Sequence, residues 1–139
     1  MYPSPSTITE GPTLELISLN GTFERKQIPL PFKPGVCRIG RQTGGMTVPT
    51  QTNGFFDSNV LSRSHAEVWA DSEKTIWIRD AGSSNGTYLN GVRLSAEGRK
   101  SEDFILQIDD VIELGIDILS EDQTSITHHK IIAKVTALE

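Results

Sequence analysis

The amino-acid sequence predicts an all-β domain. Helical periodicity is nearly absent over the 139 residues, whereas short runs of alternating apolar and polar residues recur between loops rich in glycine, asparagine and serine. Threonine, valine and isoleucine, which favour strands, are common in these runs. The length suits one domain with a single core of modest size.

The net charge and the cysteine content limit the kinds of protein that this chain can be. The formal charge of −5 and the isoelectric point near 5.2 argue against a nucleic-acid-binding surface, although a phosphate pocket needs only a local positive patch. The single cysteine, Cys37, has no partner for an internal disulfide and lies in an apolar run. We therefore predict a buried core thiol in a reducing, cytoplasmic compartment.

No apolar run is long enough to span a bilayer, and residues 1–11 lack the apolar block of a signal peptide. These residues are rich in proline, serine and threonine, so we predict a flexible leader over 1–11 and one folded domain over 12–139. The chain is expected to be soluble, either complete or as one module of a longer protein.

The predicted strands are bounded by turn residues. They span residues 13–20, 24–30, 36–39, 65–69, 75–80, 92–94, 104–106, 111–118 and 130–138. Asn20-Gly21 is a hairpin signal between the first two strands. Three prolines between residues 29 and 34 keep the next connection away from the interior of a sheet. The strand that follows brings Gly40 and Arg41 to a loop end.

Two polar stretches are predicted as connections rather than strands. Residues 42–53 are too long for a plain hairpin turn, and loops of this length are usually functional or mobile, with an inert insertion as the alternative. Residues 121–128 are expected to connect to the last strand without forming one.

The centre of the chain predicts a recognition site. Alternation places Ala66 and Val68 on one face of a strand, and His65, Glu67 and Trp69 on the other. The polar loops on either side of this hairpin are expected to leave the same end of the sheet. A rigid scaffold that holds hydrogen-bonding loops at one end is a common way to build such a site.

The chain resembles the forkhead-associated (FHA) family in its loop motifs. These are Gly40-Arg41, Leu61-Ser62-Arg63-Ser64-His65, Ser84-Asn85-Gly86-Thr87 and Leu89-Asn90-Gly91. The resemblance covers about residues 13–135, with Asp109 as a departure where the family usually has glycine. It implies an eleven-strand antiparallel β-sandwich of the SMAD/FHA type that binds phosphothreonine peptides.

The resemblance also implies residue roles. The residues that match Arg41 and Ser62 contact the phosphate most directly in the family, and Arg63 adds a second cation whose matching residue varies more. A guanidinium suits this task because its planar fork can hold two phosphate oxygens. Asn85, with Ser84 beside it, is expected to hydrogen-bond the main chain of the peptide.

Other motif residues are predicted to brace the loops. They are Gly40, His65, Gly86, Thr87 and Asn90. Gly86 is expected to take a positive φ in a tight turn. For Thr87 and Asn90, structural and binding roles are both open.

Ser62, His65 and the downstream Asp80 suggest a hydrolase triad as an alternative. Ser62, however, lies in no Gly-x-Ser-x-Gly elbow, and no oxyanion-hole motif precedes it. We therefore predict no enzymatic activity. His128-His129 is a poor metal pair because adjacent strand residues face opposite ways, so we predict no metal site and no cofactor.

Within the family, the chain resembles the sarcolemmal membrane-associated protein group and its fungal relatives. The resemblance rests on the long loop before Phe55-Phe56-Asp57, on residues 83–87, and on Gly115-Ile116-Asp117. It implies a signalling adaptor in a striatin-interacting phosphatase and kinase assembly. Its partner would be a phosphothreonine protein, with no nucleic acid and no membrane contact by this chain. A tail anchor elsewhere in a full protein would place it at an endomembrane or the nuclear envelope.

A rival from another class is a phosphate-independent interaction scaffold. Trp69 and Trp77 alternate away from the apolar face, so they either cover one side of the sheet or mark a second partner surface.

Overall fold

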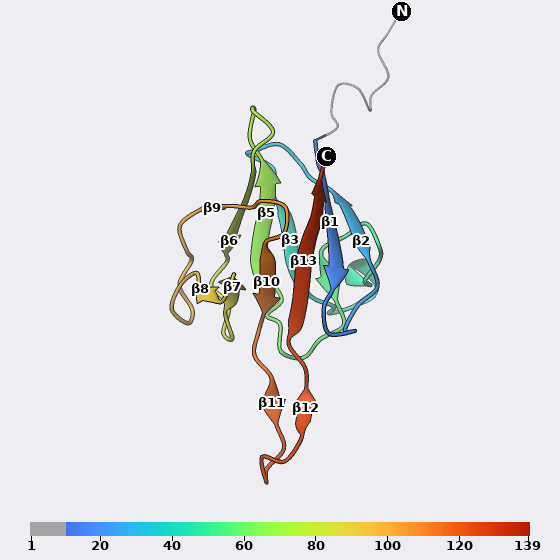
Figure 1. Cartoon of the computed structure of the whole chain (residues 1–139), viewed down its shortest axis with the longest axis vertical. Helices are drawn as coiled ribbons and strands as arrows, with labels where there is room; N and C mark the ends of the chain where they lie inside the picture. Colours follow the sequence, from blue (N-terminus) through green and yellow to red (C-terminus); the bar gives the residue numbers. More distant parts are fainter. Residues whose placement is uncertain (1–10) are drawn as a thin grey trace, which may run out of the picture.

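A computed structural model describes residues 11–139 and shows two β-sheets packed face to face (Figure 1). The six-stranded sheet has the order β2 (Lys26–Pro29), β1 (Thr13–Ser18), β13 (Ile131–Leu138), β10 (Val111–Leu114), β7 (Thr87–Leu89) and β8 (Val92–Arg93). The five-stranded sheet has the order β4 (Phe55–Phe56), β3 (Cys37–Arg41), β5 (Ala66–Ala70), β6 (Ile76–Asp80) and β9 (Phe104–Ile105). The eleven-strand sandwich is therefore confirmed, with β3 and β4 as a parallel pair among antiparallel ones.

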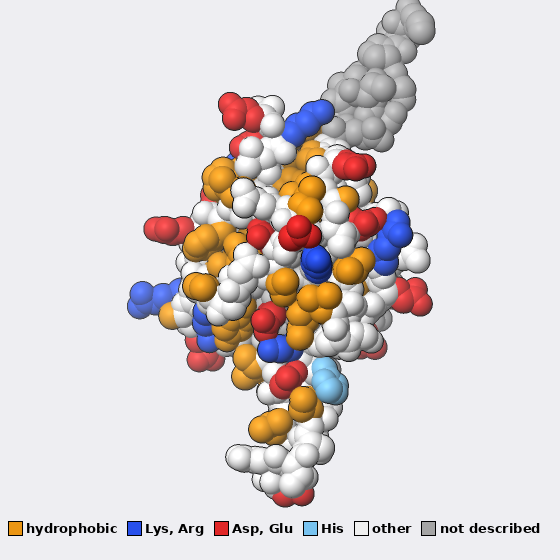
Figure 2. Space-filling view, in the orientation of Figure 1, with side chains coloured by type: hydrophobic (Ala, Val, Ile, Leu, Met, Phe, Trp, Pro, Cys, Tyr) orange, Lys and Arg blue, Asp and Glu red, His pale blue; other side chains and the backbone are white. Residues whose placement is uncertain are grey.

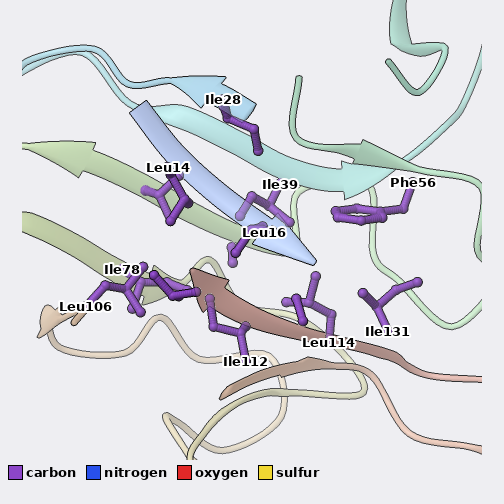
Figure 3. Close-up of a cluster of buried hydrophobic side chains, with 14 of the residues drawn as sticks. Leu14, Leu16, Ile28, Ile39, Phe56, Ile78, Leu106, Ile112, Leu114 and Ile131 are labelled. Atoms are coloured by element: carbon purple, nitrogen blue, oxygen red, sulfur yellow. The ribbon is translucent and has the colours of Figure 1, made fainter. Parts of the chain in front are cut away.

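One apolar core fills the space between the sheets. Side chains from both sheets, among them Leu14, Ile112, Ile39 and Ile78, point toward one another across it (Figure 3). Leu14, Ile78 and Ile112 come from strands in which buried and less buried positions alternate, as a period of two requires. The predicted inward face of β5 is confirmed, because Ala66 and Val68 have no exposed surface.

The outer face of β5 is covered by charged side chains and does not expose Trp69 to a partner. Trp69 lies there but is only 2% exposed. The cationic groups of Lys33 and Arg79 lie over its ring, 5.4 and 5.3 Å from the centroid. Trp77 is half-buried and its indole N–H donates a 3.0 Å hydrogen bond to Asp71. Charged side chains thus cover much of the aromatic surface that the sequence left open to two interpretations.

Two sequence predictions near the C-terminus are wrong. The predicted strand 111–118 is interrupted at Gly115, whose φ of +81° ends β10. Beyond this turn, β11 (Ile118–Leu119) and β12 (Ile126–His128) form a separate hairpin, so the predicted connection 121–128 contains a strand. This hairpin projects below the sandwich, and the described chain ends lie at the opposite end (Figure 1).

The long 42–53 loop is held at its second half by a buried lysine. The Lys26 ammonium donates hydrogen bonds to the backbone carbonyls of Thr50, Asn53 and Phe55 at 2.6, 3.0 and 2.9 Å. The backbone N–H of Gln27 also donates to the Gln51 carbonyl, so this half of the loop covers the free edge of β2.

The remaining sequence predictions have mixed outcomes. Cys37 packs against the core, as predicted, but it is half-buried rather than buried at the start of β3. Burial nonetheless raises the pKa of its thiol. Residues 1–10 of the predicted leader lie outside the described residues. Within residues 11–139, no helix is of the length and apolarity that a membrane crossing needs, and no cluster of metal-ligating side chains occurs.

Candidate functional site

The loop ends of the five-stranded sheet bring Arg41 and Ser62 side by side. The Arg41 backbone N–H donates to the Ser62 carbonyl at 3.0 Å, and the His65 N–H donates to the Ile39 carbonyl at 2.8 Å. Arg41 is the last residue of β3 rather than part of a free loop, so its backbone is fixed by the sheet. These contacts join the end of β3 to the segment that precedes β5.

A cavity of about 360 Å³ opens at this junction. The predicted site residues that line it are Arg41, Ser62, Arg63, Ser84 and Asn85, and residues 59–61 complete the wall. They come from three separate segments, at the end of β3, before β5 and between β6 and β7. The structure therefore gathers all five predicted phosphate- and peptide-contacting residues around one cavity.

Gly40 permits the close approach of two of these segments. A Cβ atom at this position would overlap the carbonyl group of Arg63 and lie 3.2 Å from the Ser62 carbonyl oxygen. Both obstacles are backbone atoms, which cannot move aside as a side chain can. Any larger residue at this position would push Ser62 and Arg63 away from Arg41.

His65 lies beneath the cavity and has no exposed surface. Its Nδ1 accepts a 3.1 Å hydrogen bond from the Ser62 backbone N–H, so Nε2 carries the proton and donates to the Gly86 carbonyl at 2.8 Å. Both ring nitrogens are engaged by backbone groups, and neither contacts the Ser62 hydroxyl. The arrangement braces the loops and does not fit the base of a hydrolase triad.

Burial lowers the pKa of His65, against the opposing effects of the Gly86 carbonyl and Asp80. The folded pKa therefore lies below 6.5, the ordinary value that the unfolded chain retains. As the pH falls below about 6.5, the unfolded state takes up the proton first, so His65 stabilises the fold above this pH and loses that effect below it.

We accordingly expect the melting temperature to fall between pH 7.5 and 5.5, and to fall less in His65→Gln. Differential scanning fluorimetry between pH 7.5 and 5.5 measures the decrease in the wild type and in His65→Gln. The double variant His128→Gln/His129→Gln is the control, because both histidines are exposed, and it should keep the full decrease. An undiminished decrease in His65→Gln would contradict the neutral brace.

Asp80 organises the β6–β7 loop from beneath, a role that the sequence analysis missed. Its carboxylate accepts hydrogen bonds from the hydroxyls of Ser83 and Thr87, and from the backbone N–H groups of Gly82 and Ser83. Asp80, Ser83 and Thr87 are buried, with exposed fractions of 1%, 0% and 0%. An aspartate at a strand end, followed closely by glycine and serine, is a signal for such a loop.

The same network decides the position of Gly86. Its φ of +93° is favourable only for glycine, and its N–H donates to the Ser83 hydroxyl at 3.0 Å. Gly86 also accepts the hydrogen bond from His65. Asn90 lies elsewhere: its side chain joins the β7–β8 turn to Asp110 and Val111, both at contacts of 2.8–2.9 Å.

Hydrogen bonds hold the cavity wall together and leave the Ser62 hydroxyl proton unused. The Ser62 hydroxyl accepts the Ser84 N–H at 3.1 Å, which leaves its own proton free to donate. Asn85 donates from Nδ2 to the Val60 carbonyl at 2.9 Å. Arg93, which the sequence analysis also missed, supports this wall by donating to the Ser84 and Ser95 carbonyls.

The charge of the cavity is positive. Within residues 11–139, neither Arg41 nor Arg63 forms an ion pair with a carboxylate. Two guanidinium groups and a hydroxyl donor at one cavity suit an anion with several acceptor oxygens. The chain is thus a β-sandwich with a cationic cavity formed by its loops, a site that complements an anionic group.

The comparison with family models gives the family. Residues 37–115, more than half of the chain, match the FHA domain, and the chain belongs to the FHA-domain family. FHA domains bind phosphothreonine peptides and are non-catalytic binding modules, in agreement with the prediction that this chain is not an enzyme.

Three curated relatives show how the chain compares with longer proteins. An uncharacterised protein of Schizosaccharomyces pombe is 42% identical over 88% of this chain and 40% of its own length. Vacuolar protein sorting-associated protein 64 of Saccharomyces cerevisiae is 38% identical over 86% of this chain and 21% of its own length. Human sarcolemmal membrane-associated protein is 36% identical over 70% of this chain and 12% of its own length. The match thus spans 40% or less of the length of each of these relatives.

Solved structures show the same fold. The FHA domain of an Arabidopsis thaliana protein is 26% identical, with a TM-score of 0.58 over 91% of this chain and 88% of that chain. The N-terminal FHA domain of Saccharomyces cerevisiae Rad53p, solved in complex with a phosphothreonine peptide, is 16% identical. It has a TM-score of 0.58 over 89% of this chain and 94% of that chain.

Proposed function

We propose that this chain binds protein segments that carry phosphothreonine, with the phosphate in the cavity beside Arg41. The observation that carries the proposal is the pair of guanidiniums of Arg41 and Arg63, which form no ion pair within residues 11–139, next to the free proton of the Ser62 hydroxyl. A phosphate near neutral pH carries almost two negative charges and three strong acceptors, which these donors complement. Membership of the FHA family supports the same ligand.

In this proposal, the peptide lies extended over the β6–β7 loop. Asn85 holds its position through Val60, and its side-chain oxygen accepts no hydrogen bond from residues 11–139. That oxygen is therefore available to a backbone N–H of the peptide. Ser84 supports the wall through its backbone and exposes its side chain toward the ligand.

Threonine is expected to bind more tightly than serine because its methyl group is buried beside the phosphate. One buried methyl contributes about 0.8 kcal/mol, roughly fourfold in affinity. Any larger preference requires that the methyl also orders the phosphate.

Isothermal titration calorimetry with matched peptides tests the proposal. An alanine-rich peptide with phosphothreonine should bind, and the same peptide without the phosphate should not. Affinity should fall as the pH drops below about 6, where the phosphate takes up its second proton. Equal binding of the two peptides would refute the proposal and favour the phosphate-independent scaffold.

We further propose that the full protein acts as a signalling adaptor in a striatin-interacting phosphatase and kinase assembly, on the cytoplasmic side of a membrane or free in the cytoplasm. The similarity to sarcolemmal membrane-associated protein supports this placement. Affinity purification of the tagged full-length protein and its Arg41→Ala variant, with and without phosphatase treatment, tests it. Microscopy of the tagged protein tests the location. A recovered assembly without striatin-type subunits would refute the adaptor role.

A further inference from the structure

A second cavity, of about 250 Å³, lies between the β1–β2 connection and β4. Its apolar wall consists of Phe23, Pro49 and Phe55, with Phe56 behind them, and two carboxylates, Glu24 and Asp57, lie at its rim. We call this cavity the acidic aromatic pocket. No predicted phosphate-binding residue lines it.

The pocket is built on a fixed base. The rings of Phe23 and Phe56 meet edge to face, with centroids 5.1 Å apart. The Lys26 ammonium lies 4.7 Å from the centroid of the Phe56 ring, and its hydrogen bonds are used on the carbonyls of the 42–53 loop. Lys26 is only 3% exposed, so its charge is committed to holding the wall.

Two free carboxylates lie at the rim of the pocket, and one cation, the Arg38 guanidinium, lies 5.0 Å from the centroid of the Phe55 ring. Glu24 and Asp57 are exposed, and within residues 11–139 neither forms an ion pair or accepts a side-chain hydrogen bond. An aromatic wall beside two free carboxylates complements a long side chain with an apolar stem and a cationic end.

The acidic aromatic pocket neighbours the cavity lined by Arg41, Ser62 and Asn85, which we call the phosphate cavity. Arg41 and Phe56 are register partners in the β3–β4 pair, and the Gln42 N–H donates to the Phe56 carbonyl at 2.9 Å. A shallow hollow of about 230 Å³ lies between them: it shares Thr22 and Asp57 with the pocket and Asn59 with the phosphate cavity. Figure 2 shows hydrophobic side chains and a histidine on the β11–β12 hairpin, which adjoins the hollow through Thr127 and His128.

The distance between the acidic aromatic pocket and the phosphate cavity is short enough for one peptide to reach both. The chain from Asp57 to Ser62 is six residues, which span at most about 20 Å when extended. An extended peptide covers the same distance in about six residues.

We propose that the acidic aromatic pocket binds a lysine or arginine side chain of the same peptide, within about six residues of the phosphothreonine. This inference rests on the proposed function. The stem packs on Phe23, and the cation approaches Glu24 and Asp57. A bound peptide thus presents opposite charges to two cavities of opposite charge, which fixes its direction and register.

The test scans one residue through a phosphothreonine peptide of otherwise neutral sequence. Lysine, arginine, glutamine or glutamate is placed at each of the six positions on either side, and affinity is measured by calorimetry. At one or two positions, lysine and arginine should bind about three- to tenfold more tightly than glutamine, because partly exposed ion pairs contribute modestly. Glutamate should bind more weakly there, and added salt should reduce the difference.

The matched variants locate the effect. Glu24→Gln/Asp57→Asn should abolish the preference and leave the affinity of the glutamine peptide unchanged. The control variant is Glu73→Gln/Glu121→Gln, which alters two exposed carboxylates outside all three cavities. This variant should keep the preference for lysine and arginine.

The outcomes separate this inference from the proposed function. If the glutamine peptide binds only when phosphorylated but no position prefers a cation, or if Glu24→Gln/Asp57→Asn keeps the preference, this inference alone is refuted. If no phosphorylated peptide binds at all, the proposed function and this inference fall together.

Discussion

Replacing Arg41 with alanine is expected to weaken phosphothreonine-peptide binding by about 2–5 kcal/mol, the usual cost of truncating one partner of a hydrogen-bonded charge pair. The fold should remain intact, because only the Arg41 backbone is shared with β4 and the Ser62 loop. Its side chain forms no ion pair within residues 11–139 that the change would break. Calorimetry gives the affinity and thermal unfolding gives the stability.

Two further variants make this result specific. Arg41→Lys keeps the charge and should still bind poorly, because an ammonium cannot hold two phosphate oxygens in a planar fork. Arg99→Ala removes an exposed arginine that lines none of the three cavities, and binding should be unchanged. If Arg41→Ala binds the peptide with full affinity, the assignment of the phosphate cavity is wrong.

Asp80→Ala is expected to give the largest loss of stability, about 3 kcal/mol or more. The variant leaves the hydroxyls of Ser83 and Thr87 and two backbone N–H groups without their acceptor in a buried site, and each unsatisfied group costs about 1–3 kcal/mol before relaxation. The loop that carries Ser84 and Asn85 should also loosen, so peptide binding should fall as well. Urea unfolding measures the stability.

The pH dependence of this effect has a defined sign. Burial raises the pKa of Asp80, but the hydrogen bonds from Ser83 and Thr87, with those of the backbone, outweigh it, so the folded pKa lies below the ordinary value. Asp80 therefore stabilises the fold above about pH 4 and loses this contribution as the pH falls through the folded pKa. The difference between the wild type and Asp80→Ala should narrow in acid.

Asp122→Ala is the matched control. Asp122 also accepts hydrogen bonds from two hydroxyls, those of Ser120 and Thr124, but it lies exposed in the β11–β12 turn. Water replaces the lost acceptor there, so stability should hardly change. An equally small effect of Asp80→Ala would mean that the β6–β7 loop does not depend on its buried carboxylate.

The sequence by itself determined the fold class, the family and most of the strands. Alternation is a local property, so Ala66 and Val68 were assigned to the core from their neighbours alone, and β5 and β6 were located by the same reasoning. The sequence also predicts that residues from Arg41 to Asn85 meet at one site, and the structure brings them to one cavity.

Only the tertiary structure decided which distant groups meet. The burial of Trp69 under Lys33 and Arg79, the buried carboxylate of Asp80, the hold of Lys26 on the 42–53 loop and the acidic aromatic pocket all depend on contacts between segments far apart in the chain. No local pattern encodes such contacts, because they arise from the closure of two sheets around one core and from the loops that this closure brings together.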